Sequence, residues 1–258
     1  MLALTLLALP SCDLLDSAIK EVEKVTNPLV GQGLFLGLEP PSDPEIEAML
    51  DEMEDAPDSV FQVFLADAAS ASEMEEAPIE GASVSVRVGD NAAVQVVDEG
   101  GGSYKAYSED GITYSAGSEA MTTMDIAGEQ SQFWITLPAA ANATVPEEMD
   151  PGTPLTIDLG QFEYDAVLGV VMNVATGNVT WDNRPESIQD IYDFTHSEEA
   201  LDSVTIPGTA FQGQSLFAVG IAGLRVTDSD SFDNMNTVLS SFMAGRMKFY
   251  LLSTIQLP

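Results

Sequence analysis

Ser83-Val84-Ser85-Val86-Arg87-Val88 is a strictly alternating stretch, with three valines at every second position. Because successive side chains of a strand point to opposite faces, the pattern predicts a β-strand with one buried face and one exposed face. Turn residues 89–91 separate it from a second apolar run at 93–97. Asp110-Gly111 is typical of a tight hairpin and predicts a further strand at Ile112-Thr113-Tyr114.

Short strand-like runs of this kind recur across residues 59–138 at the spacing expected of a β-sandwich. Residues 139–154 are rich in Ala, Pro and acids and predict a linker. A second set of runs fills residues 155–258, and its last two strands are expected on either side of a turn at Ala244-Gly245-Arg246. We therefore predict a mainly β protein with two tandem β-sandwich (Ig-like) domains, 59–138 and 155–258, and a short helical N-terminal region.

Two segments of the first predicted domain resemble a known kind of module. Pro78–Val86 contains a Gly-Ala-x-Val-x-Val strand, and Asp98–Tyr104 contains a Gly-x-Tyr hairpin. This succession resembles immunoglobulin-like or prealbumin-like modules of bacterial surface lipoproteins. The resemblance implies a β-sandwich fold and does not specify a ligand.

The charge balance is strongly acidic. Among 258 residues, 42 Asp and Glu stand against 8 Lys and Arg, for a formal net charge of -34. Nucleic acid is therefore not expected as a partner, because phosphate binding needs clustered Lys and Arg. With one Cys and one His, the chain can form neither a disulfide scaffold nor a zinc site of several Cys or His ligands.

The first residues resemble a bacterial lipoprotein signal. The run before Cys12 is apolar or small and too short to span a bilayer as a helix. Leu9-Pro10-Ser11-Cys12 resembles a lipobox, which implies a signal peptide at 1–11 and a lipid on Cys12. The expected location is extracytoplasmic, tethered to a bacterial membrane through that lipid. The alternative is a buried core cysteine behind an apolar segment.

We expect residues 12–58 to form a lipid-anchored tether that contains short helices and an acidic segment. A strand-like run is expected at Gly33–Leu38. Pro44 suits the first turn of a helix, and Ser42 and Glu45 have the spacing of a capping box. The acids that follow Glu39 are interpreted as a solvated surface; the alternative is a surface for calcium or a basic partner.

Clustered hard oxygen ligands suggest a calcium loop near the C-terminus. Asp228, Asp230, Asp233 and Asn234 lie close together in the sequence, and Ca2+ prefers such ligands. The alternative is a solvated loop in which Asp and Asn make turns. No cofactor other than calcium is expected.

Signals for catalysis are sparse. His196 is the chain's one imidazole and lies in a polar stretch, with no G-x-S-x-G elbow in the sequence. Pairs of carboxylates could in principle hydrolyse a glycosidic bond, but with 42 acids some pair lies at a suitable distance by chance. Trp134 and Trp181 each lie in an alternating run, where a core role is favoured over a sugar-stacking platform.

The combined prediction is a non-catalytic lipoprotein of the cell envelope that acts as a structural, adhesion or binding module. The first alternative is a carbohydrate- or calcium-binding surface module. The second is an envelope hydrolase that uses carboxylates, which would require a cleft with a raised carboxyl pKa.

Overall fold

The computed structural model describes residues 27–52, 57–70, 73–160, 164–185, 190, 194, 201–227 and 229–255. Its earlier elements are β1 (Leu29–Leu38), α2 (Pro44–Glu52), β2 (Ser59–Asp67), β3 (Ser83–Val88), β4 (Val94–Gly100), β5 (Ser103–Tyr107), η2 (Ser108–Asp110), β6 (Glu119–Ile126) and β7 (Glu129–Thr136). Its later elements are β8 (Leu155–Asp158), β9 (Ala166–Asn173), β10 (Val179–Asp182), β11 (Ser203–Ile206), η3 (Gly208–Phe211), β12 (Leu216–Val226), η4 (Ser229–Ser231), β13 (Phe232–Asp233) and β14 (Ser241–Ser253). The predicted mainly β class is confirmed, with a short helix in the N-terminal region.

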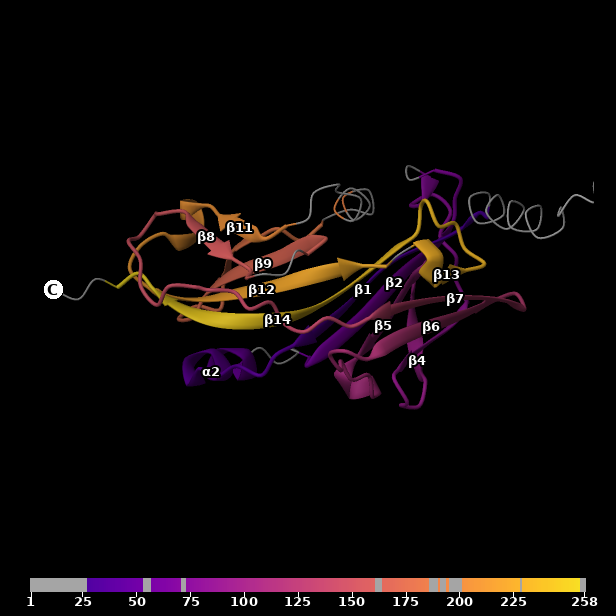
Figure 1. Cartoon of the computed structure of the whole chain (residues 1–258), viewed down its shortest axis with the longest axis horizontal. Coiled ribbons are helices and arrows are strands. Elements are labelled where there is room, and N and C mark those ends of the chain that lie inside the picture. Colours follow the sequence, from indigo (N-terminus) through magenta and orange to yellow (C-terminus); the bar gives the residue numbers. More distant parts are fainter. Residues whose placement is uncertain are drawn as a thin grey trace, which may run out of the picture.

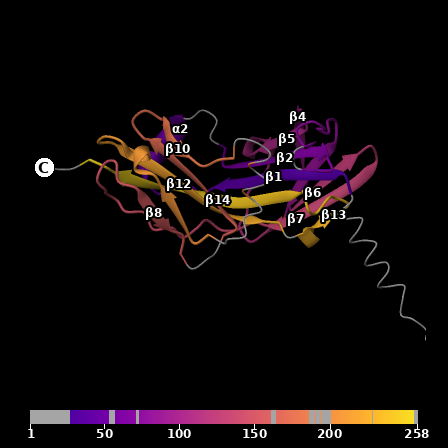
Figure 2. The same ribbon diagram turned by 90° about the horizontal axis from the view of Figure 1, so that it is seen from above.

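One sheet runs through the elongated molecule. Its strand order is β10-β9-β12-β14-β1-β2-β5-β4-β3-β6-β7-β13, and β11 and β8 form a separate two-stranded sheet. At its centre β1 and β14 are parallel, from Gln32↔Ser241 to Leu38↔Met247. These two strands follow the long axis of the molecule (Figures 1 and 2), so each contributes to the packing at both ends.

The N-terminal core lies where this sheet folds over on itself. Side chains from β1, β2 and β14 pack against side chains from β3, β6 and β7. The cluster includes Phe35, Phe61, Met124, Phe133 and Phe242. The Phe242 ring lies 4.6 Å from that of Phe133 and 5.4 Å from that of Phe61, centroid to centroid. The last strand of the chain therefore helps to close the first core.

The C-terminal core lies between β9, β12 and β14 on one side and the β8–β11 sheet with η3 on the other. Its members include Ile157, Val171, Phe211, Phe217 and Leu252. In β11 and β8 the register runs from Ser203↔Asp158 to Ile206↔Leu155. Both cores are thus sandwiched between β layers, as predicted for two β-sandwich units.

Helix α2 covers part of the opposite face of the sheet. Its Ile46 and Met49 pack with Met172, Ala218 and Phe249. The helix begins at Pro44 as predicted, but Asp43 caps it: the Asp43 Oδ1 atom accepts a hydrogen bond from the Glu45 N–H at 2.9 Å. The expected capping by Ser42 is not observed, because the helix starts one residue after Asp43.

Two expected turns take another form. Gly245 lies within the continuous strand β14. A glycine is needed there because a Cβ would clash with the Leu224 side chain and lie 2.9 Å from the Gly223 carbonyl. The glycine therefore serves a close approach of two strands and not a turn. Asp110 ends the 3-10 turn η2, and residues 112–114 form no strand. There, the Tyr114 hydroxyl instead donates a hydrogen bond to the Pro138 carbonyl at 2.7 Å.

The sheet also crosses the predicted divisions of the chain. Strand β1, within the predicted tether 12–58, pairs with β2 and β14 and lies at the centre of the sheet. Phe242 and Ala244, within the predicted second domain, belong to the N-terminal core. Residues 139–154 form isolated bridges at Thr144↔Asp158 and Glu148↔Ser253. The two units are joined by paired strands as well as by this segment.

Candidate functional site

The two halves of β14 have different neighbours. Strand β12 pairs with β14 as far as Leu216↔Ser253, whereas the pairing with β1 ends at Leu38↔Met247. Pro40 and Pro41 follow shortly afterwards. Because proline has no N–H to donate, the chain cannot continue the ladder and turns towards α2. Within the described residues, no strand pairs with β14 beyond Met247 on the side where β1 ends.

Main-chain hydrogen bonds close both ends of this unpaired edge of β14. At one end the Glu39 N–H donates to the Met247 carbonyl at 2.8 Å. At the other end the Ser253 N–H donates to the Glu147 carbonyl at 2.8 Å, and the Met149 N–H donates to the Ser253 carbonyl at 3.0 Å. We call the edge between these two ends the open edge of β14.

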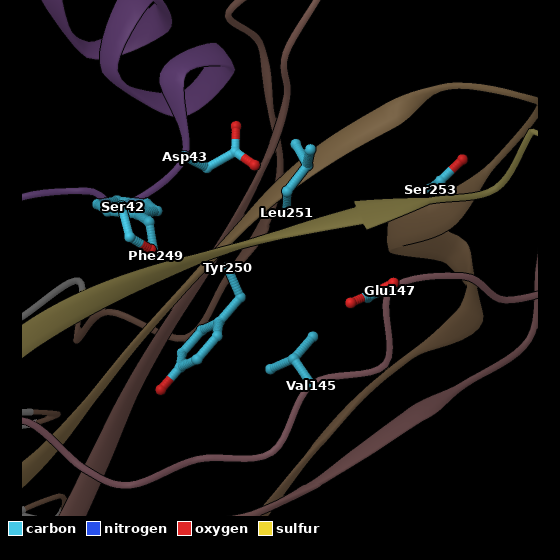
Figure 3. A pocket seen from close by; sticks show the side chains of 8 residues that line it. All are labelled: Ser42, Asp43, Val145, Glu147, Phe249, Tyr250, Leu251 and Ser253. Atoms are coloured by element: carbon cyan, nitrogen blue, oxygen red, sulfur yellow. The ribbon is translucent and has the colours of Figure 1, made fainter.

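A cavity of about 450 Å³ opens along this edge (Figure 3). Its walls come from the start of α2, the 139–154 segment and β14. The lining residues are Ser42, Asp43, Val145, Glu147, Phe249, Tyr250, Leu251 and Ser253. In Figure 3, Tyr250 and Leu251 point to opposite sides of the strand. The cavity therefore has apolar surface on both sides of the β14 backbone, Phe249 and Leu251 on one side and Tyr250 with Val145 on the other.

Two carboxylates give the cavity a negative rim. Asp43 is held in place as the cap of α2, and Glu147 is held through its backbone contact with Ser253. The nearby Lys248 ammonium lies 3.6 Å from the Glu39 carboxylate and 5.4 Å from the centroid of the Tyr250 ring. Because Glu39 already pairs with Lys248, this lysine leaves the rim acidic.

Tyr250 contributes a neutral hydroxyl and a ring. Burial raises the pKa of Tyr250, and the nearby Glu39 carboxylate acts in the same direction, while a hydrogen bond with the Ala143 backbone opposes them. The hydroxyl donates to the Ala141 carbonyl at 3.4 Å. It stays protonated at neutral pH. The site thus combines carboxylates, an aromatic ring and main-chain hydrogen-bonding groups, which suit binding.

The predicted calcium residues are partly placed. Asp230 lies in η4, and Asp233 pairs with Gln132 across β13 and β7. The Asn234 Oδ1 atom accepts a hydrogen bond from Asn27 Nδ2 at 3.0 Å, and its Nδ2 atom donates to the Gln130 carbonyl at 3.1 Å. Asp228 lies outside the described residues. Among the residues that are described, no group of three His, Cys, Asp or Glu is arranged to hold a metal ion.

The two tryptophans have different surroundings. Trp181 packs against the C-terminal core and lies over Gly169, where an added Cβ would be 2.8 Å from its ring. Trp134 faces away from the N-terminal core, half-buried, in a cross-strand row with Met121 and Arg87. The expected core role is wrong for Trp134, because the alternation of β7 buries Phe133 and Ile135 instead.

Cys12 and His196 lie outside the described residues. In the region of the chain that is described, no helix is long and apolar enough to cross a membrane.

Sequence reasoning missed the cavity at β14. A signal for it exists, since Glu39-Pro40-Pro41 ends a strand-like run abruptly. The strand that is left unpaired by this ending, however, is β14 from Lys248 onwards, which lies more than 200 residues further along the chain. Proline alone does not reveal which strand is left unpaired.

No protein-family profile matches the chain, and a search of curated proteins found no relative. Among solved structures, a segment of two fibronectin type-III domains from chicken tenascin is similar at 9% identity and a TM-score of 0.24, covering 76% of this chain and 92% of that one. Three N-terminal domains of the highly immunogenic outer capsid protein of bacteriophage RB49 are similar at 11% identity and a TM-score of 0.21, covering 85% and 59%. A chimeric titin Z1Z2 carrying a decorin peptide is similar at 10% identity and a TM-score of 0.21, covering 88% and 94%. Similarity at this level carries no information about function.

Proposed function

We propose that the protein is a non-catalytic binding module of the bacterial cell envelope, tethered to a membrane through lipid on Cys12. The lipobox-like Leu9-Pro10-Ser11-Cys12 supports the tether. Two or more acyl chains, at about 0.8 kcal/mol for each buried CH2 group, would hold the chain firmly at a bilayer.

The observation that carries the binding role is the position of the cavity. Asn27, just before β1, donates a hydrogen bond to Asn234, and β1 pairs with β14 from Gln32↔Ser241 onwards, so Asn27 lies near the start of β14. The cavity lies along the far half of the same strand, up to Ser253. β14 spans Ser241–Ser253, which corresponds to about 40 Å at roughly 3.3 Å per residue. In Figure 1 the start of β1 and the C-terminal end of β14 lie at opposite ends of the molecule, so the cavity lies far from Asn27, and this arrangement favours a cavity that faces away from the membrane.

Intact mass and fractionation of the protein, expressed in a host that processes lipoproteins, test the tether. Wild type should have an acylated N-terminus at Cys12 and partition with membranes, whereas Cys12→Ala should be released. Ser11→Ala keeps a small residue before the cysteine and should behave as wild type. An unprocessed N-terminus, with the same partitioning in all three proteins, would overturn the proposal.

The outward row of Trp134 supports a second candidate function, glycan binding. Trp134 lies beside Met121, and in the adjacent row the Gln132 Nε2 atom donates to Thr123 Oγ1 at 3.3 Å. An indole ring beside side-chain amides and hydroxyls suits a sugar, which stacks and hydrogen-bonds at once. Pull-down with insoluble peptidoglycan, comparing wild type with Trp134→Ala, tests this. Equal retention of both proteins would rule out this face.

A further inference from the structure

We propose that the open edge of β14 binds an extended, basic polypeptide segment by strand addition. The inference deepens the proposed function by naming the class of partner, and it rests on that function only for the binding role. Whether Cys12 carries lipid does not affect it.

The first step is the direction of the backbone groups along β14. In a strand, the N–H and C=O of residues two apart point to the same side. Met247 and Ser253 both bond towards the side where β1 ends. Phe249 and Leu251, at the positions between them, therefore point their N–H and C=O groups towards the same side. Among the described residues, the pairing of β14 with β1 ends at Met247, and no other hydrogen bond to the main-chain groups of Phe249 and Leu251 is found on this side.

The second step is that these groups face a cavity. Phe249 and Leu251 are both among its lining residues. Unpaired main-chain groups at a sheet edge are a ready template for another strand. From Met247 to Ser253 the strand spans about 20 Å at roughly 3.3 Å per residue, which leaves room for about five residues of an extended peptide opposite positions 248–252. Both ends of this room are closed, by Glu39 and by Glu147, so the register of an added peptide would be limited.

The third step is the match of side chains. An added strand would alternate its side chains between the two faces of the sheet. On one face they would meet Phe249, Leu251 and the start of α2. On the other face they would meet Tyr250 and Val145. Both faces offer apolar surface, and the carboxylates of Asp43 and Glu147 lie at the rim.

The fourth step is charge, which selects the partner. The rim is acidic, and the whole chain carries a formal net charge of -34. A segment with Lys or Arg would be attracted to it, and like charge disfavours a second copy of this chain. The occupant is therefore a basic segment of another protein.

A defined peptide tests the proposal. The probe is Lys-Val-Lys-Val-Lys with blocked termini, added to full-length Cys12→Ala protein so that lipidation plays no role. Upon binding, hydrogen exchange at the amides of Phe249 and Leu251, measured by NMR, should slow at least tenfold. The amides of Tyr250 and Leu252, which point to β12, should not change.

Two peptide controls separate strand pairing from charge attraction. The same peptide with N-methylated backbone amides should bind at least tenfold more weakly, because it cannot donate to the strand edge. Glu-Val-Glu-Val-Glu should also bind at least tenfold more weakly.

A pair of matched variants locates the site. Asp43→Asn with Glu147→Gln removes two charges from the rim, keeps a capping residue at position 43, and should weaken binding at least fivefold. Glu75→Gln with Glu76→Gln removes the same charge from exposed residues elsewhere on the chain and should have no effect.

Three results would overturn the proposal: no binding of the lysine peptide, binding without slower exchange at Phe249 and Leu251, or equal weakening by the two pairs of substitutions. None of these would alter the acylated mass at Cys12. Failure of the peptide site and failure of the tether are thus distinguishable.

Discussion

Strands β3 and β12 show two ways of building the same sheet. In β3, Val84, Val86 and Val88 are buried and the residues between them are exposed or half-buried. In β12, every residue from Phe217 to Leu224 is buried. The outer face of β3 meets solvent, whereas β12 contacts the C-terminal core on one face and the clusters around Met172 and Met243 on the other. Alternation thus marks a strand at the surface of the molecule, and its loss marks a strand covered on both faces.

Substitution by aspartate should have the largest effect and tests whether β12 is buried on both faces and β3 on one. Ala218→Asp and Val219→Asp should each destabilise the fold by more than about 4 kcal/mol, because consecutive positions of β12 face different cores. In β3, Val86→Asp should be as severe, but Arg87→Asp should cost less than about 1 kcal/mol. Urea unfolding followed by circular dichroism measures all four. If Ala218→Asp were as mild as Arg87→Asp, the two-sided burial of β12 would be wrong.

Neighbouring aromatic residues in β7 sharpen the comparison at the surface. Phe133 is buried in the N-terminal core and Trp134 points outward. Phe133→Ala should cost about 3 to 5 kcal/mol, as for other buried aromatics, and Trp134→Ala about 1 kcal/mol. The difference between the two urea midpoints is the test. Equal losses would mean that Trp134 belongs to a packed interior.

A substitution at Gly33 tests the packing of β1 against β14, the parallel pair at the centre of the sheet. It pairs with Phe242, and a Cβ there would clash with the Phe242 ring and lie 2.7 Å from the Gln62 carbonyl. Gly33→Ala should therefore cost about 2 kcal/mol from overpacking. Gly177→Ala, where a Cβ meets nothing but the backbone has a φ of 67°, should cost about 1 kcal/mol. A thermal melt that left Gly33→Ala unchanged would contradict the close packing of β1 on β14.

The smallest expected effect concerns alkaline pH. Burial raises the pKa of Tyr114 above its usual value, and the nearby Arg246 acts in the opposite direction. Because the folded state holds this proton more tightly than the unfolded state, the stabilisation is present below about pH 10 and is lost as the pH rises beyond it.

Tyr114→Phe removes the hydrogen bond to Pro138 and should cost about 1 kcal/mol at neutral pH. Its unfolding free energy should then fall less steeply between about pH 10 and 11 than that of wild type. Parallel slopes for the two proteins, measured by urea titration, would show that Tyr114 does not titrate differently on folding.

The comparison of β3 with β12 also explains what the sequence could predict. The alternation of β3 and the paired runs of β6 and β7 identify these strands and the mainly β class. Gly245 looks like a turn residue, yet it lies within β14, because its role is set by Leu224 on a strand about twenty residues earlier. Such a contact is long-range and leaves no local signature.

The candidate site was less predictable than the fold. Asp43 and Glu147 belong to an ordinary background of acids, and Tyr250 belongs to an ordinary strand. They become a site because β1 stops at Leu38 while β14 continues to Ser253. The length of one strand relative to its partner depends on their register, which only the folded sheet defines.

The parallel pairing of β1 and β14 has a mechanical consequence. A pull on the N-terminal end of β1 and on the C-terminal end of β14 acts in opposite directions along the strands. The hydrogen bonds from Gln32↔Ser241 to Leu38↔Met247 lie across that direction, so the load falls on all of them at once. A hairpin such as β6–β7, pulled from its open end, would instead lose its residue pairs in succession. Single-molecule pulling between residues 27 and 255 should therefore give a higher rupture force than opening that hairpin. With the proposed tether before β1 and a partner pulling at the end of β14, the force would act along this shear direction, in which the β1–β14 pair resists best.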